Sequence, residues 1–376
     1  MQGERFSMID VDIDQFWKDD ALAHGDNCFC EGPQVAFGIR MSDECVYAEL
    51  GEEGHPWAPE EWARRIELNK RYNDKAEKIV GRRLLLEEYP PEDAQFPYVK
   101  RIGEVFGGNY HYHNNTEWLE SSIEDETALA RVLDRVETLD YRAFMLPHNW
   151  ESEKRRIFDT YGLKPQASRF IRGPVTLAVS IYGAEQLLYL LLDEPELSAR
   201  FSRAITHAAR QMTLVMDEEA GVTAGSHPGY SFNDDYCCLL SPELYERFGY
   251  PVLKTLFDHY SPGENDMRYQ HSDSAMGHLL PILGRLHLTG VNFGPTVLTP
   301  EIRKYLPRAR IDGCISPMTF MRNDWDRLIE ETKRDCADGL SCGGLNIFTA
   351  GSINNGSSLE SMRLMMSVVQ QFGRRC

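Results

Sequence analysis

The segment YQHSDSAMGHLLPIL, residues 269–283, places a histidine and an aspartate two residues apart at the end of an apolar run. In an extended strand, positions i and i+2 lie on the same face, so His271 and Asp273 can point into one pocket. Such a pair can bind a metal ion through an imidazole nitrogen and a carboxylate oxygen. It can also transfer a proton, with the aspartate setting the pKa of the imidazole. The structural alternative is that Asp273 or Ser272 caps the following helix and His271 only makes a nearby hydrogen bond.

The segment FNDDYCC supplies a second candidate, Asn233-Asp234-Asp235, which also directly follows an apolar run. Closely spaced carboxylates can share a proton or hold a cation. An Asx turn that precedes a helix uses the same residue types and is the structural alternative. The sequence leaves both interpretations open.

Two further groups contain residue types that bind metals. His111 and His113 are spaced as in an HxH metal pair, but the glycines and asparagines around them predict an exposed hairpin or loop. Cys237, Cys238 and Cys342 could act as thiolate ligands or nucleophiles, although none has a cysteine or histidine partner at ligand spacing. We therefore expect these cysteines to be buried thiols.

The chain alternates short apolar runs with segments whose apolar residues recur about every 3.6 positions. The runs predicted as strands are 34–39, 142–146, 168–173, 229–233, 267–270, 290–294, 311–316 and 345–350. The clearest helical segments are 183–220 and 241–260, the second with Ser241 as N-cap and Pro242 at its first position.

This alternation predicts an α/β fold in which a parallel sheet closes into a (β/α)8 barrel of the TIM type. The glycine-rich phosphate turn that usually follows the first strand of an open nucleotide-binding sheet is missing from the sequence. We expect a single barrel domain over residues 1–376, in which 1–140 includes an N-terminal elaboration of helices and a hairpin at the barrel mouth. Active sites of such barrels lie at the carboxyl ends of the strands. That rule selects Arg172, Asn233, Asp234, Asp235, His271, Ser272, Asp273, Asn292, Ser316 and Ser352.

The overall composition limits the class of partner. Hydrophobic residues make up 42% of the 376 residues and charged residues 26%, as in ordinary globular proteins, and the net charge is −18. Nucleic acids and anionic membranes require a basic face, so neither is expected to bind.

Nine cysteines without a CxxC motif predict reduced thiols in a cytoplasmic protein. The longest apolar run, residues 187–192, is too short to cross a bilayer.

Several segments together resemble the uroporphyrinogen decarboxylase superfamily. FIRGPVTLAVSIYGAEQLLYLLLDEPELSARF is similar to the family's Gly-Pro-x-Thr-Leu-Ala turn with its helix and Pro-Glu pair. FNDDYCCLLSPELYERFGYPVLKTLFD is similar to the next strand end and its Ser-Pro-Glu helix. HSDSAMGHLLPIL and GGLNIFTAGSINNGSSLESMRLMMSVVQQFGR resemble the last strands and the terminal helix. The resemblance covers about residues 100–375 and implies a (β/α)8 barrel.

The superfamily contains two chemistries. Its porphyrinogen decarboxylases carry an N-terminal Met-Arg-Gln-Ala-Gly-Arg-Tyr motif, whose arginines bind the carboxylates of the substrate. In this chain Arg40 is the only cation in the matching region, and acidic residues follow it. Without a basic clamp, a chain of net charge −18 is poorly suited to a porphyrinogen with eight carboxylates. Haem biosynthesis is therefore not expected.

The other branch contains methyltransferases that work with corrinoid proteins or thiol acceptors, and their zinc is held by a His-x-Cys pair and a later cysteine. The resemblance places His271 at the histidine position, but Asp273 and Ser352 at the two cysteine positions. Without thiolates, tightly held zinc is not expected. Two alternatives remain. One is a weakly held divalent ion on His271 with Asp273 or Asp234, and the other is a metal-free proton-transfer couple of His271 and Asp273.

The resemblance implies an enzyme that transfers a methyl group from a small methylated or methoxylated compound to a corrinoid protein, with cobalamin carried by that partner. In this scheme His271 and Asp273 polarise or protonate the leaving heteroatom, and Asp234 orients the substrate. The substrate-binding residues are expected to be Arg172, Asn233, Asp235, Asn292 and Ser352. A decarboxylase of a small carboxylic acid and a non-catalytic ligand-binding barrel are the alternatives. Members of the superfamily often form dimers, so a homodimer is a further expectation.

Overall fold

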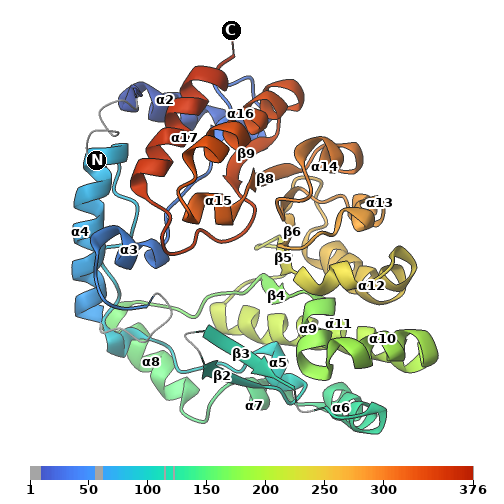
Figure 1. Cartoon of the computed structure of the whole chain (residues 1–376). Helices are drawn as coiled ribbons and strands as arrows, with labels where there is room; N and C mark the ends of the chain where they lie inside the picture. Colours follow the sequence, from blue (N-terminus) through green and yellow to red (C-terminus); the bar gives the residue numbers. More distant parts are fainter. Residues whose placement is uncertain (1–9, 56–61, 114–115, 122, 376) are drawn as a thin grey trace. The chain divides into compact units, whose positions relative to one another are not determined.

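The computed structural model describes residues 10–55, 62–113, 116–121 and 123–375 (Figure 1). The chain divides into two compact units. We call the first the terminal unit, which comprises Met1–Tyr89, Ala275–Gly277 and Gly290–Cys376. The second, the central unit, comprises Pro90–Ser274 and His278–Thr289. The single barrel domain over residues 1–376 stays a prediction.

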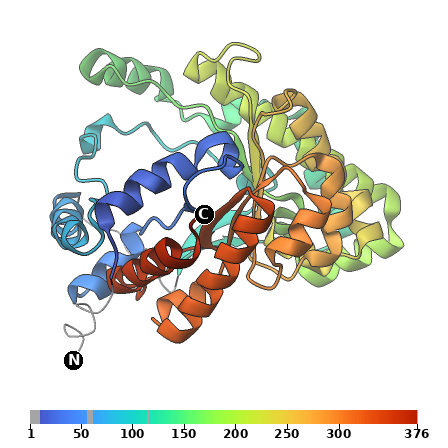
Figure 2. The same ribbon diagram turned by 90° about the horizontal axis from the view of Figure 1, so that it is seen from above.

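The terminal unit is built on four parallel strands in the order β1-β9-β8-β7. These are β1 (Ala36–Phe37), β7 (Gly290–Phe293), β8 (Arg310–Ile315) and β9 (Leu345–Thr349). Its helices are α2 (Ile13–Ala23), α3 (Val46–Leu50), α4 (Trp62–Val80), α14 (Thr299–Tyr305), α15 (Pro317–Met321), α16 (Trp325–Cys342) and α17 (Leu359–Phe372). The last two long helices, α16 and α17, lie side by side in both views (Figure 1, Figure 2).

The segment before α2 is joined to the last helix, α17, by hydrogen bonds in this unit. The backbone N–H of Asp12 donates to Gln370 Oε1 at 2.8 Å, and the Ser367 hydroxyl donates to the carbonyl of Asp10 at 2.6 Å. Phe16 and Phe37 pack edge to face in the core, with ring centroids 5.4 Å apart. The N-terminal segment thereby completes the apolar core around β1 and β9.

The central unit contains three parallel strands in the order β6-β5-β4. They are β4 (Phe170–Arg172), β5 (Tyr230–Asn233) and β6 (Arg268–Ser272). Its helices are α5 (Ile102–Val105), α6 (Glu126–Thr138), α7 (Tyr141–Met145), α8 (Trp150–Tyr161), α9 (Pro174–Tyr182), α10 (Ala184–Asp193), α11 (Pro195–Ala220), α12 (Pro242–Tyr260) and α13 (Leu280–Leu283). An antiparallel hairpin, β2 (Asn109–His113) and β3 (Thr116–Glu120), lies against α5 and α9 (Figure 1).

Local sequence explains the long helices. The Ser241 hydroxyl accepts a hydrogen bond from the backbone N–H of Leu244, and Pro242 occupies the first turn of α12, as the sequence predicts. Helix α11 also begins with a proline, Pro195, and ends at Gly221, whose φ of 69° is the left-handed conformation that favours glycine. Both helices present apolar faces, and Phe201 of α11 packs edge to face on Phe248 of α12.

Seven of the eight predicted strands are confirmed, all in parallel sheets, and helices alternate with them. The strand predicted at 142–146 is wrong, because this segment belongs to α7. The Asp140 carboxylate accepts from the N–H of Ala143 and caps the helix. Tyr141 and Met145 are buried four positions apart, while Arg142 between them is exposed, which is a helical pattern. The helices and the hairpin predicted within residues 1–140 are present among the described residues.

No single helix among the described residues has the length and apolar character needed to cross a bilayer. Helices α9 and α10 reach that composition only when they are taken together, across a bend of 109°.

Candidate functional site

Three of the predicted site residues form a row across the sheet of the central unit. The parallel register pairs Arg172 at the end of β4 with Asn233 at the end of β5, and Asn233 with His271 on β6. All three are partly exposed. Because paired positions in neighbouring strands project from the same face, the row gathers a guanidinium, an amide and an imidazole at the carboxyl ends of the strands.

His271 is the centre of a compact polar cluster. Its Nε2 lies 3.2 Å from Asp273 Oδ1 and 3.9 Å from Asp235 Oδ1. The backbone N–H of Asp273 donates to Asp235 Oδ1 at 2.8 Å, which fixes the second carboxylate against the end of β6. The imidazole is mostly buried, whereas the side chain of Asp273 is 51% exposed. The cluster is therefore anchored on its protein side and open to solvent on the other.

Neither Ser272 nor Asp273 caps a helix in the structure. The next helical turn begins only at Gly277, and helix α13 has no side-chain cap. The Ser272 hydroxyl is buried and lies 2.8 Å from the Ser274 hydroxyl, while Asp273 bonds to His271. The i, i+2 spacing thus brings His271 and Asp273 together on one side, as the sequence predicts.

Asp234 is placed differently from its neighbour Asp235. It is fully buried, and its Oδ1 accepts the backbone N–H of Thr176 at 2.8 Å in the first turn of α9. Burial raises the pKa of this carboxyl to about 6, although the hydrogen bonds from Thr176 and Val175 act in the opposite direction. Asp235, which the sequence assigns to substrate binding, is the carboxylate that accompanies His271. A substrate contact of Asp234 stays a prediction.

Gly173 makes this arrangement possible. A Cβ at this position would lie 2.2 Å from the Cβ of Asp234, so a larger residue cannot fit without displacing the strand end. The N–H of Gly173 also donates to the carbonyl of Asn233 at 2.7 Å. The Gly-Pro-Val-Thr turn is therefore matched to the Asn-Asp-Asp segment, a relationship between residues about 60 positions apart that sequence spacing alone could not indicate.

Two predicted substrate-binding residues lie in the terminal unit. Asn292 is buried on β7, and its Nδ2 donates to the carbonyl of Thr349 at 2.9 Å and to that of Asp312. These bonds tie β7 to β8 and β9, which is a structural role. Ser352 is exposed in the loop after β9. Ser316, also at a strand end, caps α15 through a bond from the N–H of Thr319. Substrate contacts of Asn292 and Ser352 stay predictions.

The other candidates have simpler environments. His111 lies on the exposed hairpin, where its Nε2 is 2.7 Å from Glu120 Oε2, and it belongs to no metal-ligating group among the described residues. The cysteines that the structure describes are all free. Burial raises the pKa of Cys237 well above its usual value, which makes this thiol a poor nucleophile or ligand. The Cys342 thiol donates to the carbonyl of Asp338 at 3.0 Å.

The cluster of Asp235, His271 and Asp273 offers one ligand atom from each residue, and these atoms lie within 4.8 Å of one another. Such a set combines one imidazole with two carboxylates and could hold a single divalent cation. It does not fit the thiolate zinc centre that the methyltransferase branch of the family implies, because an aspartate occupies the cysteine position beside His271.

Comparison with known families identifies the family of the chain. The sequence model described as Uroporphyrinogen decarboxylase (URO-D) matches residues 162–372, more than half of the chain. The chain belongs to the uroporphyrinogen decarboxylase family. The matched region contains β4 to β9 and every residue of the row and the cluster. Because the family fold is a (β/α)8 barrel, the fold class predicted from the sequence is confirmed.

A solved structure with a similar fold is a methyltransferase from Methanosarcina mazei. It matches with a TM-score of 0.51 and 14% sequence identity, and the alignment covers 82% of this chain and 86% of that protein. At this identity the likeness concerns the fold. No curated protein matches the chain.

Proposed function

We propose that this member of the uroporphyrinogen decarboxylase family is a methyltransferase that demethylates a small methylated or methoxylated compound, with a corrinoid protein as the methyl acceptor. The observation that carries the proposal is the position of His271 Nε2 between the carboxylates of Asp273 and Asp235 at the carboxyl end of β6. This is where barrel enzymes of this type bind their substrates.

Demethylation requires a proton because an ether oxygen or an amine nitrogen departs poorly as an anion. A protonated His271 would form ion pairs with both carboxylates and could give its Nε2 proton to the leaving heteroatom. The carbon–heteroatom bond then breaks, the methyl group passes to the acceptor, and the heteroatom keeps the proton. A reduced corrinoid on the partner protein supplies the nucleophile for this transfer.

Each of the three cluster residues has a role in this scheme. His271 is the proton donor, and Asp273 orients the ring and balances its charge. Asp235 is held by the N–H of Asp273 and provides the second carboxylate. Arg172 and Asn233 continue the row across β4 and β5 and would contact the remainder of the substrate.

The environment of Arg40 argues against a porphyrinogen as the substrate. Its guanidinium donates to the carbonyls of Phe37 and Ile39 and lies 3.8 Å from an Asp20 carboxylate oxygen. These contacts bind Arg40 to its own unit, so it does not provide a basic clamp for several substrate carboxylates.

The proposal can be tested by incubating the protein with candidate methyl donors and reduced cobalamin, and by following methylcobalamin formation by absorbance. Methylamines, methanol and methoxylated aromatic compounds are suitable donors. His271→Gln and Asp273→Asn should lower the rate about 10²–10⁴-fold, as expected when a general acid is lost. His227→Gln, which changes an exposed histidine in the same unit, is the matched control and should keep the rate.

Two outcomes would contradict the proposal. One is release of carbon dioxide from carboxylated donors without methyl transfer, which would indicate a decarboxylase of a small acid. The other is ligand binding that is retained in the His271→Gln, Asp273→Asn double variant, with no turnover of any donor, which would indicate a binding protein.

A further inference from the structure

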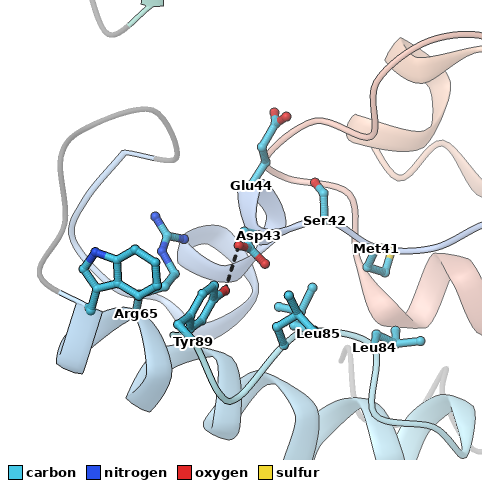
Figure 3. Close-up of a pocket in the computed structure, with 10 residues that line it drawn as sticks. Met41, Ser42, Asp43, Glu44, Arg65, Leu84, Leu85 and Tyr89 are labelled. Atoms are coloured by element: carbon cyan, nitrogen blue, oxygen red, sulfur yellow. Dashed lines mark hydrogen bonds between the residues drawn. The ribbon is translucent and has the colours of Figure 1, made fainter. Parts of the chain in front are cut away.

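The terminal unit contains a cavity of about 660 Å³, whose lining includes no residue of the His271 cluster (Figure 3). Its walls come from the loop after β1, from the first turn of α4 and from the segment that follows α4. The lining residues are Met41, Ser42, Asp43, Glu44, Trp62, Arg65, Leu84, Leu85, Leu86 and Tyr89. The volume is within the range of small-molecule sites in proteins.

The loop that carries the acidic residues is held in place by the segment after β9. The Ser42 hydroxyl donates to the carbonyl of Ile353 at 3.1 Å, and the Cys45 thiol donates to that of Asn354 at 3.5 Å. Trp62 and Tyr89, which also line the cavity, pack edge to face with ring centroids 4.8 Å apart. These contacts form the cavity without a ligand, which reduces the entropy lost on binding.

A basic group in the cavity lacks a matching acceptor. The Nη2 of Arg65 donates to the Tyr47 hydroxyl at 3.5 Å, but its Nη1 is buried without a hydrogen-bond acceptor among the described residues. Arg65 lines the cavity and forms no ion pair with a described residue, so a ligand carboxylate would supply the counter-ion that its guanidinium lacks. Planar carboxylates match the guanidinium particularly well.

Acidic groups lie in the same cavity and do not neutralise Arg65. Asp43 Oδ2 accepts a hydrogen bond from the Tyr89 hydroxyl at 3.4 Å, as Figure 3 shows. Glu44 forms no ion pair with any described residue, and its partial burial raises the pKa of its carboxyl. The cavity thus contains one guanidinium and two carboxylates. A ligand with only a negative charge would be repelled by both carboxylates, and a ligand with only a positive charge would leave Arg65 without an acceptor.

We propose that this cavity binds a small zwitterion, an α-amino acid with an apolar side chain. The ligand's carboxylate pairs with Arg65, and its ammonium group pairs with Asp43 and Glu44. Leu84, Leu85 and Met41 form an apolar wall that receives the side chain (Figure 3). The proposal concerns binding alone, so it can fail or hold independently of methyl transfer.

The test is calorimetric titration of the full chain at pH 8 with four probes that separate these contributions. L-leucine carries both charges and the apolar group, 4-methylpentanoate lacks the ammonium, isoamylamine lacks the carboxylate, and glycine lacks the side chain. We expect L-leucine to bind at least about tenfold more tightly than each of the other three, because each of them loses one contact.

Substitutions of Arg65 and Glu44 test which charged group of the ligand each residue binds. Arg65→Gln should weaken L-leucine and 4-methylpentanoate about tenfold without weakening isoamylamine, whereas Glu44→Gln should weaken L-leucine and isoamylamine without weakening 4-methylpentanoate. Arg64→Gln, which changes an exposed arginine beside Arg65, is the matched control. Thermal unfolding checks that each variant is folded. Absence of L-leucine binding at 10 mM would overturn the proposal. Equal affinity for L-leucine and a singly charged probe, or unchanged affinities in both variants, would also overturn it.

Discussion

The carboxylate of Asp234 and the backbone N–H of Thr176 form a buried 2.8 Å hydrogen bond that joins the end of β5 to the first turn of α9. A carboxylate at a helix N-terminus accepts an otherwise unpaired N–H and interacts favourably with the helix dipole. Asp234 therefore fixes the strand end that carries Asn233 and Asp235. The carboxyl group of Asp234 is itself fully buried, so its protonation affects the stability of the fold.

We expect Asp234 to make the protein less stable as pH rises from about 4 to about 6. Burial raises the pKa of this carboxyl from 3.8 to about 6, so the folded state binds more protons than the unfolded state across this window. The free energy of unfolding therefore falls as pH rises, by on the order of 2 kcal/mol. Asp234→Asn keeps the acceptor for Thr176 but removes the titration.

The measurement is urea unfolding of both proteins between pH 4 and pH 8. The variant should gain stability relative to the wild type as pH rises through this window and show a constant difference above it. A difference that does not depend on pH would mean that Asp234 titrates normally. Asp335→Asn is a useful comparison, because Asp335 in the terminal unit has its pKa raised to about 6 by burial as well.

Gly173→Ala should be strongly destabilising because its Cβ would lie 2.2 Å from the Cβ of Asp234. We expect a loss of about 3 kcal/mol or more, since backbone atoms on both sides would have to move. Gly162→Ala is the matched control. Gly162 ends α8 with φ of 68° and has no atom near the added Cβ, so only the left-handed conformation costs free energy, about 1 kcal/mol. If both variants lose the same free energy of unfolding in thermal or chemical denaturation, the strand end can move to accommodate the added methyl group.

Glu219 should contribute to stability with the opposite pH dependence. Burial alone would raise the pKa of this carboxyl, but hydrogen bonds from Lys154, Trp150 and Arg142 outweigh burial and lower it. The bonds from Trp150 and Lys154 are 2.6 and 2.5 Å long. A lowered pKa gives stability that is complete above the usual value of 4.5 and is lost as pH falls below it.

Glu219→Gln should therefore destabilise the protein at pH 7 by about 2 kcal/mol, because two cations and an indole lose a charged acceptor. The effect should shrink at low pH, where the wild-type carboxyl is also neutral. Glu218→Gln changes the adjacent exposed glutamate, which is 3.7 Å from Arg142, and should have little effect. Chemical unfolding at pH 7 and pH 3.5 measures both variants. A loss that is the same at the two pH values would contradict the assignment.

Sequence reasoning predicted the fold better than the roles of single carboxylates. Alternation of apolar runs located seven strands, and strand periodicity placed His271 and Asp273 on one side. It could not assign Asp234 and Asp235, because neighbouring residues at a strand end face opposite ways and the end of the strand is uncertain by a residue. The partner of Asp234 is 58 residues away, so only the folded chain reveals its role. The apolar run at 142–146 had too few residues to separate strand from helix.

The last prediction concerns metal binding by Asp235, His271 and Asp273. One imidazole and two carboxylates should bind a single Zn²⁺ or Mn²⁺ weakly and release it on dialysis against EDTA, because no thiolate contributes. Binding should weaken as pH falls, since the imidazole must be neutral to coordinate a metal. Excess Zn²⁺ should inhibit methyl transfer, because a cation at Nε2 displaces the proton that the proposed reaction uses.

Titration with a zinc-sensitive dye and elemental analysis of untagged protein measure this affinity. His271→Gln and Asp273→Asn should abolish the binding, whereas His227→Gln should retain it. Stoichiometric zinc that survives EDTA, together with activity that depends on it, would contradict both the weak site and the role of His271 as proton donor. In that case the two carboxylates would act as ligands, and the proton would have to come from another group.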